Sequence, residues 1–208
     1  MGNSDFNTRL LGKNLFDLVF GLLGFIILSP VLLLIAAVIK LTSPGPVFFL
    51  QERVGKDGKP FKIFKFRTMI PDAEKHGLKI TVGKDHRVTG VGEFLRKYKL
   101  DELPQIINIV RGEMSFVGPR PEVPRYVAHY SEAERRVLSV RPGVTDLASI
   151  KYRKEHELLG ESSDPEKTYI EEIMPEKLRI NLEYVENAAF HNDVKLLWQT
   201  VKAVFFGG

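Results

Sequence analysis

The longest apolar run of the chain lies near its N-terminus. Leu18 to Ile39 are 22 residues without a formal charge. A helix of that length reaches about 33 Å at 1.5 Å per residue, enough for the hydrocarbon core of a bilayer. The run exceeds the apolar region of a signal peptide, and Lys40 follows it directly without a small-residue cleavage site. The pattern therefore predicts a retained membrane anchor.

Ser29 and Pro30 interrupt this run near its middle. Proline has no amide hydrogen, and its ring clashes with the carbonyl four residues back, so the helix must kink or break there. Two topologies remain: a kinked helix that crosses the bilayer, or a re-entrant helix-break-helix that returns to the face from which it entered. Hydropathy alone favours the span, because membrane helices tolerate proline.

Charges beside the anchor place only one of its ends. Residues 40–67 carry seven basic and two acidic side chains, which puts the large C-terminal part on the cytoplasmic side by the positive-inside rule. The N-terminal arm balances two basic against two acidic residues: Arg9, Lys13, Asp5 and Asp17. The side on which this arm lies stays open.

The remaining residues, 41–208, begin with a hairpin pattern and form one unit. VFFLQERV and FKIFKFRTM flank the turn GKDGKP, which predicts a small β-hairpin close to the membrane. Regular alternation puts Lys65 and Arg67 on one face of it. These side chains either serve a site, or solvate a strand and contact anionic lipid headgroups.

Apolar residues recur at helical spacing after residue 100, at Leu103, Ile106, Ile107 and Val110. The spacing predicts a helix that buries this stripe. Asp101 is its expected N-cap, Pro104 lies in its first turn and Gly112 is its expected stop. Asp101 and Glu102 then occupy a helix N-terminus, where the dipole favours ionised carboxylates and capping alone explains them.

Cations surround this carboxylate pair in the sequence. Arg96 and Lys97 precede it, and Arg120 lies between two prolines that fix its backbone direction, as suits a planar, bidentate target. A divalent metal or a phosphorylated substrate reconciles the carboxylates with so many cations, because Mg²⁺ bridges carboxylate and diphosphate oxygens. The pattern indicates a site that handles phosphate groups.

The C-terminal third adds further basic candidates and two helical regions. RPGVTDLASIKYR (141–153) contributes Arg141 and Arg153, each of which surface solvation also explains. Residues 154–187 hold ten acidic and four basic side chains, which predicts a solvated helical region starting near Asp164. A terminal amphipathic helix then has an apolar face made of Val194, Leu197, Trp198, Val201, Val204 and Phe205. It either docks on the core or lies in the membrane interface with Trp198 as an anchor.

Composition narrows the class of protein. The 208 residues are 44% apolar and 27% charged, which is globular and excludes disordered and fibrous classes. The absence of cysteine removes disulfides, thiolate zinc sites and cysteine nucleophiles, and the five histidines lack zinc-ligand spacing. A net charge of +4 indicates an anionic partner without identifying it.

Several motifs, in this order, resemble the bacterial sugar transferase family, the monotopic phosphoglycosyl transferases. They are the apolar run with Ser29-Pro30, KFRTM (65–69), LRKYKLDELPQIINIVRGEMSFVGPRPE (95–122), RPGVT (141–145) and EYVEN (183–187). The resemblance implies an α+β fold of the small, catalytic-core type. It also implies that residues 1–40 form an N-terminal arm with a re-entrant membrane helix-break-helix, which reverses the preference for a span. Residues 41–208 are then expected to form a mainly helical cytoplasmic domain with the small β-hairpin and amphipathic interfacial helices.

The resemblance also implies an activity and its partners. Members move a phosphosugar from a UDP-sugar to undecaprenyl phosphate, with Mg²⁺, at the cytoplasmic face of the bacterial inner membrane. Asp101 is similar to the family's nucleophile, which implies an aspartyl-phosphosugar intermediate. The implied partners are the two substrates and the lipid bilayer, with a second copy of the chain as a candidate and no nucleic acid.

Carried over position by position, Glu102 is the partner of Asp101, and both are the implied Mg²⁺ ligands. The positions implied for substrate or phosphate binding are Lys65, Arg67, Arg96, Arg120, Arg141, Arg153 and Glu183. The chain departs from the family pattern at DLAS (146–149) and in an insertion-like acidic stretch from about 155 to 180. Both departures bear on sugar specificity.

Two other classes fit parts of the pattern. A membrane-anchored anion-binding module would use the basic hairpin, but it gives no reason for Asp101 and Glu102 beside it. A metal-dependent membrane lipid phosphatase shares the carboxylates and the cations. Such a phosphatase would release free phosphate and no nucleoside monophosphate.

Overall fold

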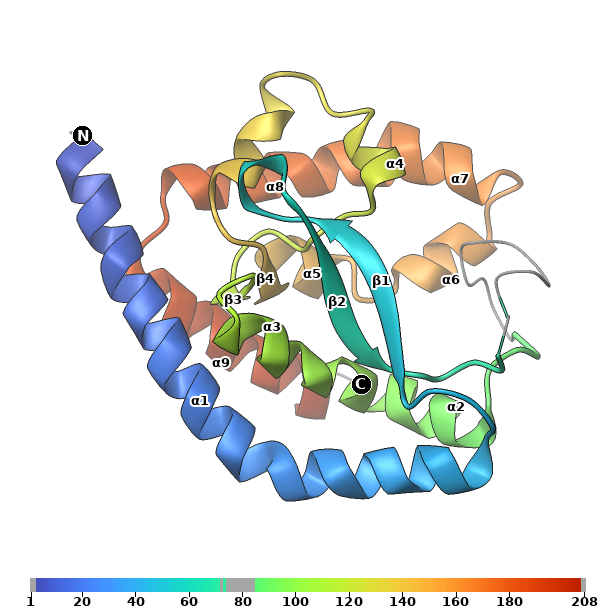
Figure 1. The fold of residues 1–208 in the computed structure, drawn as a ribbon. Coiled ribbons are helices and arrows are strands. Elements are labelled where there is room, and N and C mark those ends of the chain that lie inside the picture. Colours follow the sequence, from blue (N-terminus) through green and yellow to red (C-terminus); the bar gives the residue numbers. More distant parts are fainter. Residues whose placement is uncertain (1–2, 72, 74–84, 207–208) are drawn as a thin grey trace.

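A computed structural model describes residues 3–71, 73 and 85–206 of the chain. Its helix α1 (Asn3–Thr42) contains the whole apolar run, with Pro30 inside it. The Ser29 hydroxyl donates to the Ile26 carbonyl at 2.8 Å. The chain therefore stays helical at Pro30 and bends instead of breaking, so that α1 forms an L along two sides of the domain (Figure 1).

The helix α1 is long and apolar enough to cross a membrane. Its segment Leu11–Thr42 reaches a mean hydropathy of 2.9, and only 11% of that apolar window is buried inside the protein. An exposed apolar surface of this extent is typical of a contact with lipid or with another protein. The structure thus agrees with a membrane-associated helix.

The hairpin forms where the sequence predicts it. Strands β1 (Phe48–Val54) and β2 (Pro60–Phe66) pair antiparallel, with Phe48 opposite Phe66 and Val54 opposite Pro60. The short 3₁₀ turn η1 (Lys56–Gly58) connects them, and Gly58 has a φ of 74° that glycine adopts without strain.

The middle of the chain consists of short elements. The helical ones are α2 (Gly90–Lys97), η3 (Leu100–Gln105), α3 (Ile106–Val110), α4 (Pro124–Val127) and η4 (Glu134–Ser139). The strands β3 (Ser115–Val117) and β4 (Gly143–Thr145) pair in parallel, Ser115 opposite Gly143. Gly112 follows α3 with a left-handed φ of 74°, so the helix stops where the sequence predicts.

The C-terminal part is helical. It comprises α5 (Leu147–Lys151), α6 (Glu155–Gly160), α7 (Pro165–Thr168), the π-helix η5 (Tyr169–Ile173), α8 (Met174–Glu186) and α9 (Phe190–Phe206). Asp164 caps α7 by accepting from the Lys167 amide at 3.1 Å, so the predicted start is confirmed. The expectation of a solvated region is wrong for one face, because Tyr169, Ile173 and Leu178 are buried.

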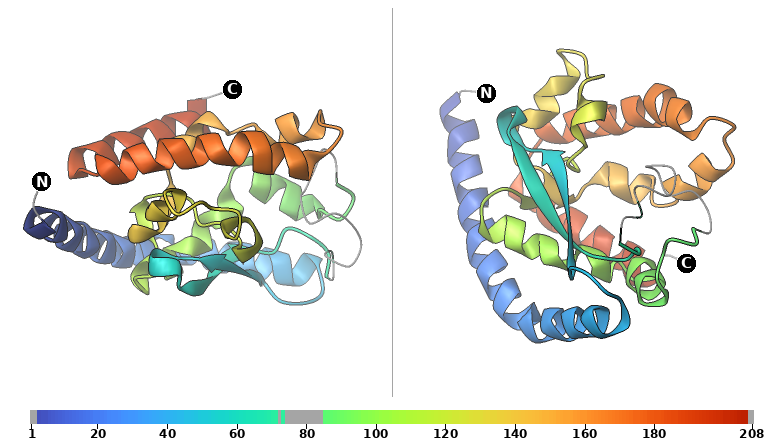
Figure 2. Two further views of the ribbon diagram at one scale, coloured as in Figure 1. Left: turned by 90° about the horizontal axis from the view of Figure 1, so that it is seen from above. Right: turned by 45° about the vertical axis from the view of Figure 1, so that its right-hand side comes forward.

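Two hydrophobic clusters hold these elements together. One joins α1 to the hairpin and to α2 and α3 through Leu32, Ile39, Ile63, Phe66, Leu95, Ile106, Ile109 and Met114. The other joins the end of β1 to α4, η4 and the helices from α6 to α8. Seen from above, α8 and α9 lie on one side and the hairpin on the other (Figure 2). The fold is thus the expected mixture of helices with a small hairpin.

Helix α9 docks on the core through a different face from the apolar stripe. Among its described side chains, Asp193 and Leu196 are buried, and Thr200 hydrogen-bonds to Thr145 on β4 at 2.6 Å. Trp198 is 61% exposed and Val194 is 48% exposed. Of the predicted stripe, Val194, Trp198 and Val201 therefore face outward and Leu197 is half-buried. The side chains of Val204 and Phe205 lie outside the described ones.

Candidate active site

The predicted carboxylate pair lies in the 3₁₀ helix η3, and the capping expected for Asp101 is wrong. Lys99, whose φ of 56° is left-handed, stands at the N-cap position, and Asp101 and Glu102 fall inside the first turn. The tighter 3₁₀ turn begins the helix earlier than the apolar spacing suggests. Asp101 caps no helix here, so capping does not account for it.

Two cations hold Glu102. The Arg120 guanidinium grips both of its carboxylate oxygens, with Nη2 on Oε1 and Nη1 3.2 Å from Oε2. The Lys65 ammonium donates to Oε1 at 2.9 Å. Because the three side chains are 15–31% exposed, water screens them little, and a bidentate arginine contact is strong there. Glu102 is thereby fixed in place.

Ionisation in this cluster follows from these contacts. Burial acts to raise the pKa of Glu102, but Arg120 and Lys65 together hold that pKa well below its usual range. Burial lowers the pKa of Lys65, and Glu102 opposes the shift. The charge of Glu102 raises the pKa of Arg120. Glu102 is therefore an anion near neutral pH, with both oxygens engaged.

Asp101 differs from its neighbour. Its Oδ1 is buried and has no hydrogen-bond partner within the described part of the chain. Burial, and after it the charge of Glu102, raises the pKa of Asp101, whereas Lys65, Lys99 and Arg96 lower it. Leaving a buried acceptor unpaired costs about 1–3 kcal/mol. A carboxylate kept in this state among cations is typical of an oxygen that contacts a ligand.

A close backbone crossing at two glycines, Gly118 and Gly143, positions Arg120 beside this cluster. A Cβ on Gly143 would lie 2.1 Å from the amide nitrogen of Gly118, and a Cβ on Gly118 would lie 2.6 Å from the carbonyl oxygen of Arg141. Only glycine lets the two backbones cross this closely. The motifs FVGPRP and RPGVT meet at this crossing, and Arg120 leaves it two residues later.

Arg96 reaches the same region from α2. Gly92 lets α2 pack against the backbone of Thr68, since a Cβ there would lie 2.0 Å from the Thr68 carbonyl oxygen. The Arg96 Nε then donates to the Thr68 hydroxyl at 2.8 Å. Burial lowers the pKa of Arg96 and Asp101 opposes the shift, so the two side chains are close enough to interact.

The other predicted positions lie in different surroundings. Arg67 donates to the carbonyls of Ser43 at 2.9 Å and Pro44 at 2.6 Å, at the end of α1. Arg141 lies beside Gly112 and interacts with Asp17 of α1. Arg153 is exposed just after α5, and Glu183 pairs with Arg179 on the exposed face of α8. The structure thus gathers Lys65, Arg96 and Arg120 around the pair, whereas the described contacts of Arg67, Arg141 and Glu183 are made elsewhere.

Sequence reasoning overlooked Asn108, which fastens the site to the hairpin. Its fully buried amide accepts from the Phe64 amide at 3.0 Å, and donates to the Lys62 carbonyl at 2.8 Å and to Glu113 at 2.7 Å. These bonds hold α3, and with it η3, against β2. The available signal was a polar residue inside the apolar run IINIV, because a buried amide requires partners.

The site offers little to a metal ion on its own. Over the described residues, no three His, Asp or Glu side chains gather as a ligand set. Asp101 has an unpartnered carboxylate oxygen, whereas both oxygens of Glu102 are already engaged by cations. Mg²⁺ commonly binds through one or two carboxylates together with substrate phosphates. The residues therefore fit an ion that is shared with a bound diphosphate.

Known proteins are similar in sequence to this chain over nearly the whole length of the chain. The family model described as bacterial sugar transferase matches residues 8–207. A UDP-N-acetylgalactosamine-undecaprenyl-phosphate N-acetylgalactosaminephosphotransferase of Aeromonas hydrophila is 35% identical over 194 residues, 92% of this chain and 43% of that protein. A UDP-glucose:undecaprenyl-phosphate glucose-1-phosphate transferase of Escherichia coli is 40% identical over 200 residues, 93% of this chain and 40% of that protein.

A shorter relative matches along most of its own length as well. An uncharacterised sugar transferase of Bacillus subtilis is 36% identical over 192 residues, which cover 92% of this chain and 86% of that protein. By contrast, the chain spans about two fifths of the length of the Aeromonas hydrophila and Escherichia coli proteins.

Proposed function

Because this chain belongs to the bacterial sugar transferase family, we propose that it moves a phosphosugar from a UDP-sugar to undecaprenyl phosphate, giving undecaprenyl-diphosphate-sugar and UMP. The names of two longer relatives, the Aeromonas hydrophila and Escherichia coli transferases, support both substrates. One observation carries the assignment of the site. Glu102 is clamped by Arg120 and Lys65, whereas the adjacent Asp101 keeps a buried oxygen without a hydrogen bond.

In the first step, an ionised oxygen of Asp101 attacks the phosphorus that carries the sugar. A P–O bond to Asp101 forms, the bond to the bridging oxygen breaks, and UMP leaves with that oxygen and the electron pair. Lys65, Arg96 and Arg120 bring positive charge to the phosphate oxygens as negative charge develops on them. The result is an aspartyl-phosphosugar.

In the second step, an oxygen of undecaprenyl phosphate attacks the same phosphorus. The P–O bond to Asp101 breaks, the free carboxylate is restored, and the lipid diphosphate sugar leaves. Neither step requires a proton on the leaving group, because a phosphate monoester and a carboxylate both leave as anions. A site of cations without a dedicated general acid is sufficient for this chemistry.

Glu102 acts by position and charge in both steps. An anion with both oxygens engaged is a poor proton donor, so Glu102 serves to orient Lys65 and Arg120. Its charge also raises the pKa of Asp101, which makes the carboxylate a stronger nucleophile. Asp101, together with the diphosphate oxygens, would hold Mg²⁺, which supplies neutralisation of phosphate charge when bound. Glu102 could join the ion only by releasing a cation.

The N-terminal half of α1 is tied to the catalytic domain by polar and apolar contacts. Lys13 pairs with Asp193 of α9. The Phe16 ring meets the Phe116 ring edge-on, with 6.4 Å between centroids. Gly21 lies against Ile109 of α3, where a Cβ would be 3.0 Å from a methyl carbon.

The C-terminal half of α1 is tied to the same domain. Ile39 is 2% exposed in the core cluster beside the hairpin, and Arg67 binds the two carbonyls that follow the helix. A straight span would carry the ends of α1 to opposite faces of a core about 30 Å thick. Contacts from both ends to one polar domain support a re-entrant helix, and the positive-inside rule favours the cytoplasmic face.

Exposed aromatic side chains extend this membrane contact to two other helices. Phe94 on α2 and Tyr98 at its C-cap are 56% and 48% exposed, and their rings contact each other at a tilt of 54° with 4.9 Å between centroids. Trp198 and Val201 are exposed on α9. Aromatic residues with a polar edge, such as Tyr98 and Trp198, favour the headgroup region, which supports an interfacial position for α2 and α9 beside α1.

Cysteine labelling tests this topology, because the chain contains no cysteine. Single cysteines replace Asn3 and Lys56, and intact cells are treated with a membrane-impermeant maleimide. Both positions are expected to stay unlabelled. A proline inside a helix costs roughly 3 kcal/mol, so replacing Ser29 and Pro30 by alanine should let α1 straighten. Asn3 should then be labelled in part of the population. Labelling at Asn3 with the unchanged anchor would show a single-pass span.

A release assay tests the reaction itself. The purified protein is incubated with Mg²⁺ and each of a panel of UDP-sugars, with and without undecaprenyl phosphate, and UMP is measured. Acceptor-dependent UMP with one or a few donors is the expected result. Release of free phosphate in place of UMP would identify a lipid phosphatase, and binding of anions without turnover would identify a binding module.

A further inference from the structure

A second buried polar network adjoins the active site and is centred on Glu122. Its carboxylate accepts hydrogen bonds from the Arg53 guanidinium at 3.3 Å, from the Val123 amide at 2.8 Å and from the Tyr169 hydroxyl. The side chains of Arg53 and Glu122 are each 17% exposed. The two reaction steps do not use this network, so its presence two residues after Arg120 requires another explanation.

The backbone beside Arg120 is held by the same network. The Val54 amide donates to the Glu122 carbonyl at 2.9 Å, and Arg53 also donates to the Pro121 carbonyl at 3.0 Å. Pro119 and Pro121 restrict the backbone on either side of Arg120. Because the segment 119–123 is stiff and fastened to β1, a displacement of Glu122 is transmitted to Arg120.

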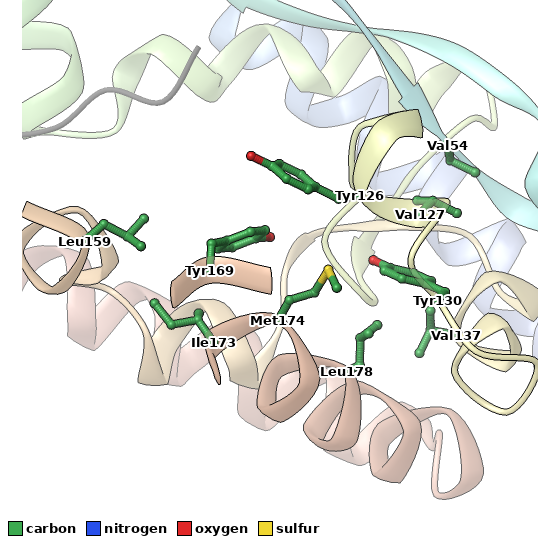
Figure 3. Close-up of a cluster of buried hydrophobic side chains, with 10 residues drawn as sticks. All are labelled: Val54, Tyr126, Val127, Tyr130, Val137, Leu159, Tyr169, Ile173, Met174 and Leu178. Atoms are coloured by element: carbon green, nitrogen blue, oxygen red, sulfur yellow. The ribbon is translucent and has the colours of Figure 1, made fainter. Parts of the chain in front are cut away.

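Tyr169 belongs to the acidic stretch 155–180, whose role the sequence leaves open. It is 6% exposed and packs in the core cluster beside Tyr126, with 4.9 Å between ring centroids (Figure 3). Its surroundings are otherwise largely apolar, with Val54, Leu159 and Met174 in the same cluster. A buried hydroxyl requires a partner, and Tyr169 reaches Glu122 across 47 residues of sequence.

The π-helix η5 explains how Tyr169 arrives there. The segment Tyr169–Ile173 has wider turns than an α-helix and connects α7 to α8. Such insertions turn side chains relative to the flanking helix and often occur near functional sites. Here the first residue of η5 is the one whose hydroxyl meets Glu122.

We propose that Tyr169 is a positioning residue for Arg120 and acts through Glu122, so that the acidic stretch 155–180 orders the loop that binds the donor phosphates. This role rests on the proposed function of Arg120. Glu122, held by Tyr169, keeps Arg53 engaged at the loop. Arg120 and Lys65 then remain the two partners of Glu102.

Tyr169→Phe tests this by removing a single oxygen, and Tyr126→Phe is the matched control. Tyr126 lies in the same cluster, but its hydroxyl accepts from Arg125 at 3.0 Å instead of meeting Glu122. For Tyr169→Phe we expect KM for the UDP-sugar to rise about three- to tenfold with a smaller change in kcat, as for the indirect loss of a hydrogen bond to a charged group. Tyr126→Phe should leave KM within about twofold, the usual range for a change outside the site.

A double variant distinguishes positioning from general weakening of the fold. If Tyr169 acts through Arg120, adding Tyr169→Phe to Arg120→Lys should raise KM little further, because residues in one network are not additive. Full additivity, or equal effects of Tyr169→Phe and Tyr126→Phe, would overturn the proposal.

Amide hydrogen exchange provides a readout that needs no turnover. Tyr169→Phe should speed exchange at Val54 and Val123, whose amides donate to the Glu122 carbonyl and carboxylate, whereas Tyr126→Phe should not. Unchanged exchange at these amides would also overturn the proposal. A protein that releases no UMP from any UDP-sugar but shows the expected exchange would refute the proposed function and leave the ordering of the loop by Tyr169 supported.

Discussion

Two buried clusters of charge in this molecule have similar parts and different consequences. The site cluster consists of Lys65, Asp101, Glu102 and Arg120. The anchor cluster, at the N-terminal half of α1, consists of Lys13, Asp17, Tyr184 and Asp193. In each cluster one carboxylate is fully engaged: Glu102 by two cations, and Asp193 by Lys13 and the Tyr184 hydroxyl at 2.7 Å. In each, the other carboxylate is an aspartate, Asp101 or Asp17, which keeps one buried oxygen without a hydrogen bond in the described structure.

Access and charge separate the two aspartates. Asp17 is 1% exposed, and its other oxygen accepts from the Phe116 amide at 3.2 Å. Asp101 is only half-buried and interacts with Lys65, Lys99 and Arg96 in addition to Glu102. An unpaired carboxylate oxygen thus indicates a reactive site where the residue is partly exposed and cations outnumber carboxylates, as at Asp101. Where the whole residue is buried, as at Asp17, it indicates a structural contact.

The sharpest test of this difference replaces each aspartate by asparagine. Asp101→Asn should reduce UMP release at least about a thousandfold, because the amide is not a nucleophile. Asp17→Asn should keep its hydrogen bond from the Phe116 amide and retain most of the activity. UMP release by both proteins, purified in the same detergent, is the measurement.

Folding must be matched for that pair to be informative. Both variants should extract with the membrane fraction and unfold within a few degrees of the unchanged protein. Activity above a few per cent in Asp101→Asn, or equal losses in the two variants, would remove the distinction between the clusters.

Arg120→Lys sharpens the comparison within the site cluster. Lysine keeps the charge but replaces the two-pronged grip on Glu102 by a point contact. We expect a loss of about 1–3 kcal/mol in kcat/KM for the donor, the range for a charged hydrogen bond. Donor kinetics equal to those of the unchanged protein would assign Arg120 to structure alone.

Asp193→Asn probes the anchor cluster by its stability. The amide can still accept from Tyr184, but Lys13, which is 17% exposed, loses its counter-charge. We expect the free energy of unfolding to fall by about 1–2 kcal/mol, less than for a fully buried pair. The measurement is a lower Tm in detergent. The KM of the remaining folded enzyme should be unchanged. A raised KM with unchanged Tm would contradict the structural role of this cluster.

The loss of activity and the loss of stability should occur at different pH values. This is the smallest of the four expected effects. The pKa of Asp101 is raised from its ordinary value of 3.8, so kcat/KM should fall as pH drops through a point above 3.8. The pKa of Glu102 is lowered, so the stability that it provides is present above its unfolded value of 4.5 and is lost only as pH falls through its lower folded pKa. Activity should therefore be lost at higher pH than the fold. Coincident loss in kcat/KM and Tm profiles would contradict this.

Local patterns predicted those features whose causes are local in the chain. The turn GKDGKP marked the hairpin, Gly112 marked the end of a helix and Asp164 marked the start of α7, because each depends on a few adjacent residues. The capping expected for Asp101 failed because a 3₁₀ turn replaced an α-helical one, a choice that depends on packing against β2.

The sequence pattern could not predict contacts between residues that are distant in the chain. Spacing placed Lys65, Glu102 and Arg120 among the candidates, but nothing in it joins Lys65 to Glu102 across 37 residues. The crossing of Gly118 and Gly143 brings Arg120 to Glu102, and that crossing exists only in the folded backbone. The network of Glu122 and Tyr169 was missed for the same reason, because Tyr169 lies in a stretch whose charge suggested a solvated surface.

The central claim is that Asp101, and not its engaged neighbour, is the nucleophile, and trapping the intermediate tests it most directly. The protein is mixed with Mg²⁺ and an accepted UDP-sugar without undecaprenyl phosphate, quenched, digested and examined by mass spectrometry. A peptide covering residues 100–111 should gain the mass of the phosphosugar, with the modification on Asp101. Adding undecaprenyl phosphate before the quench should remove it. A modification on Glu102, or UMP release from the donor with no adduct under these conditions, would contradict the assignment of Asp101.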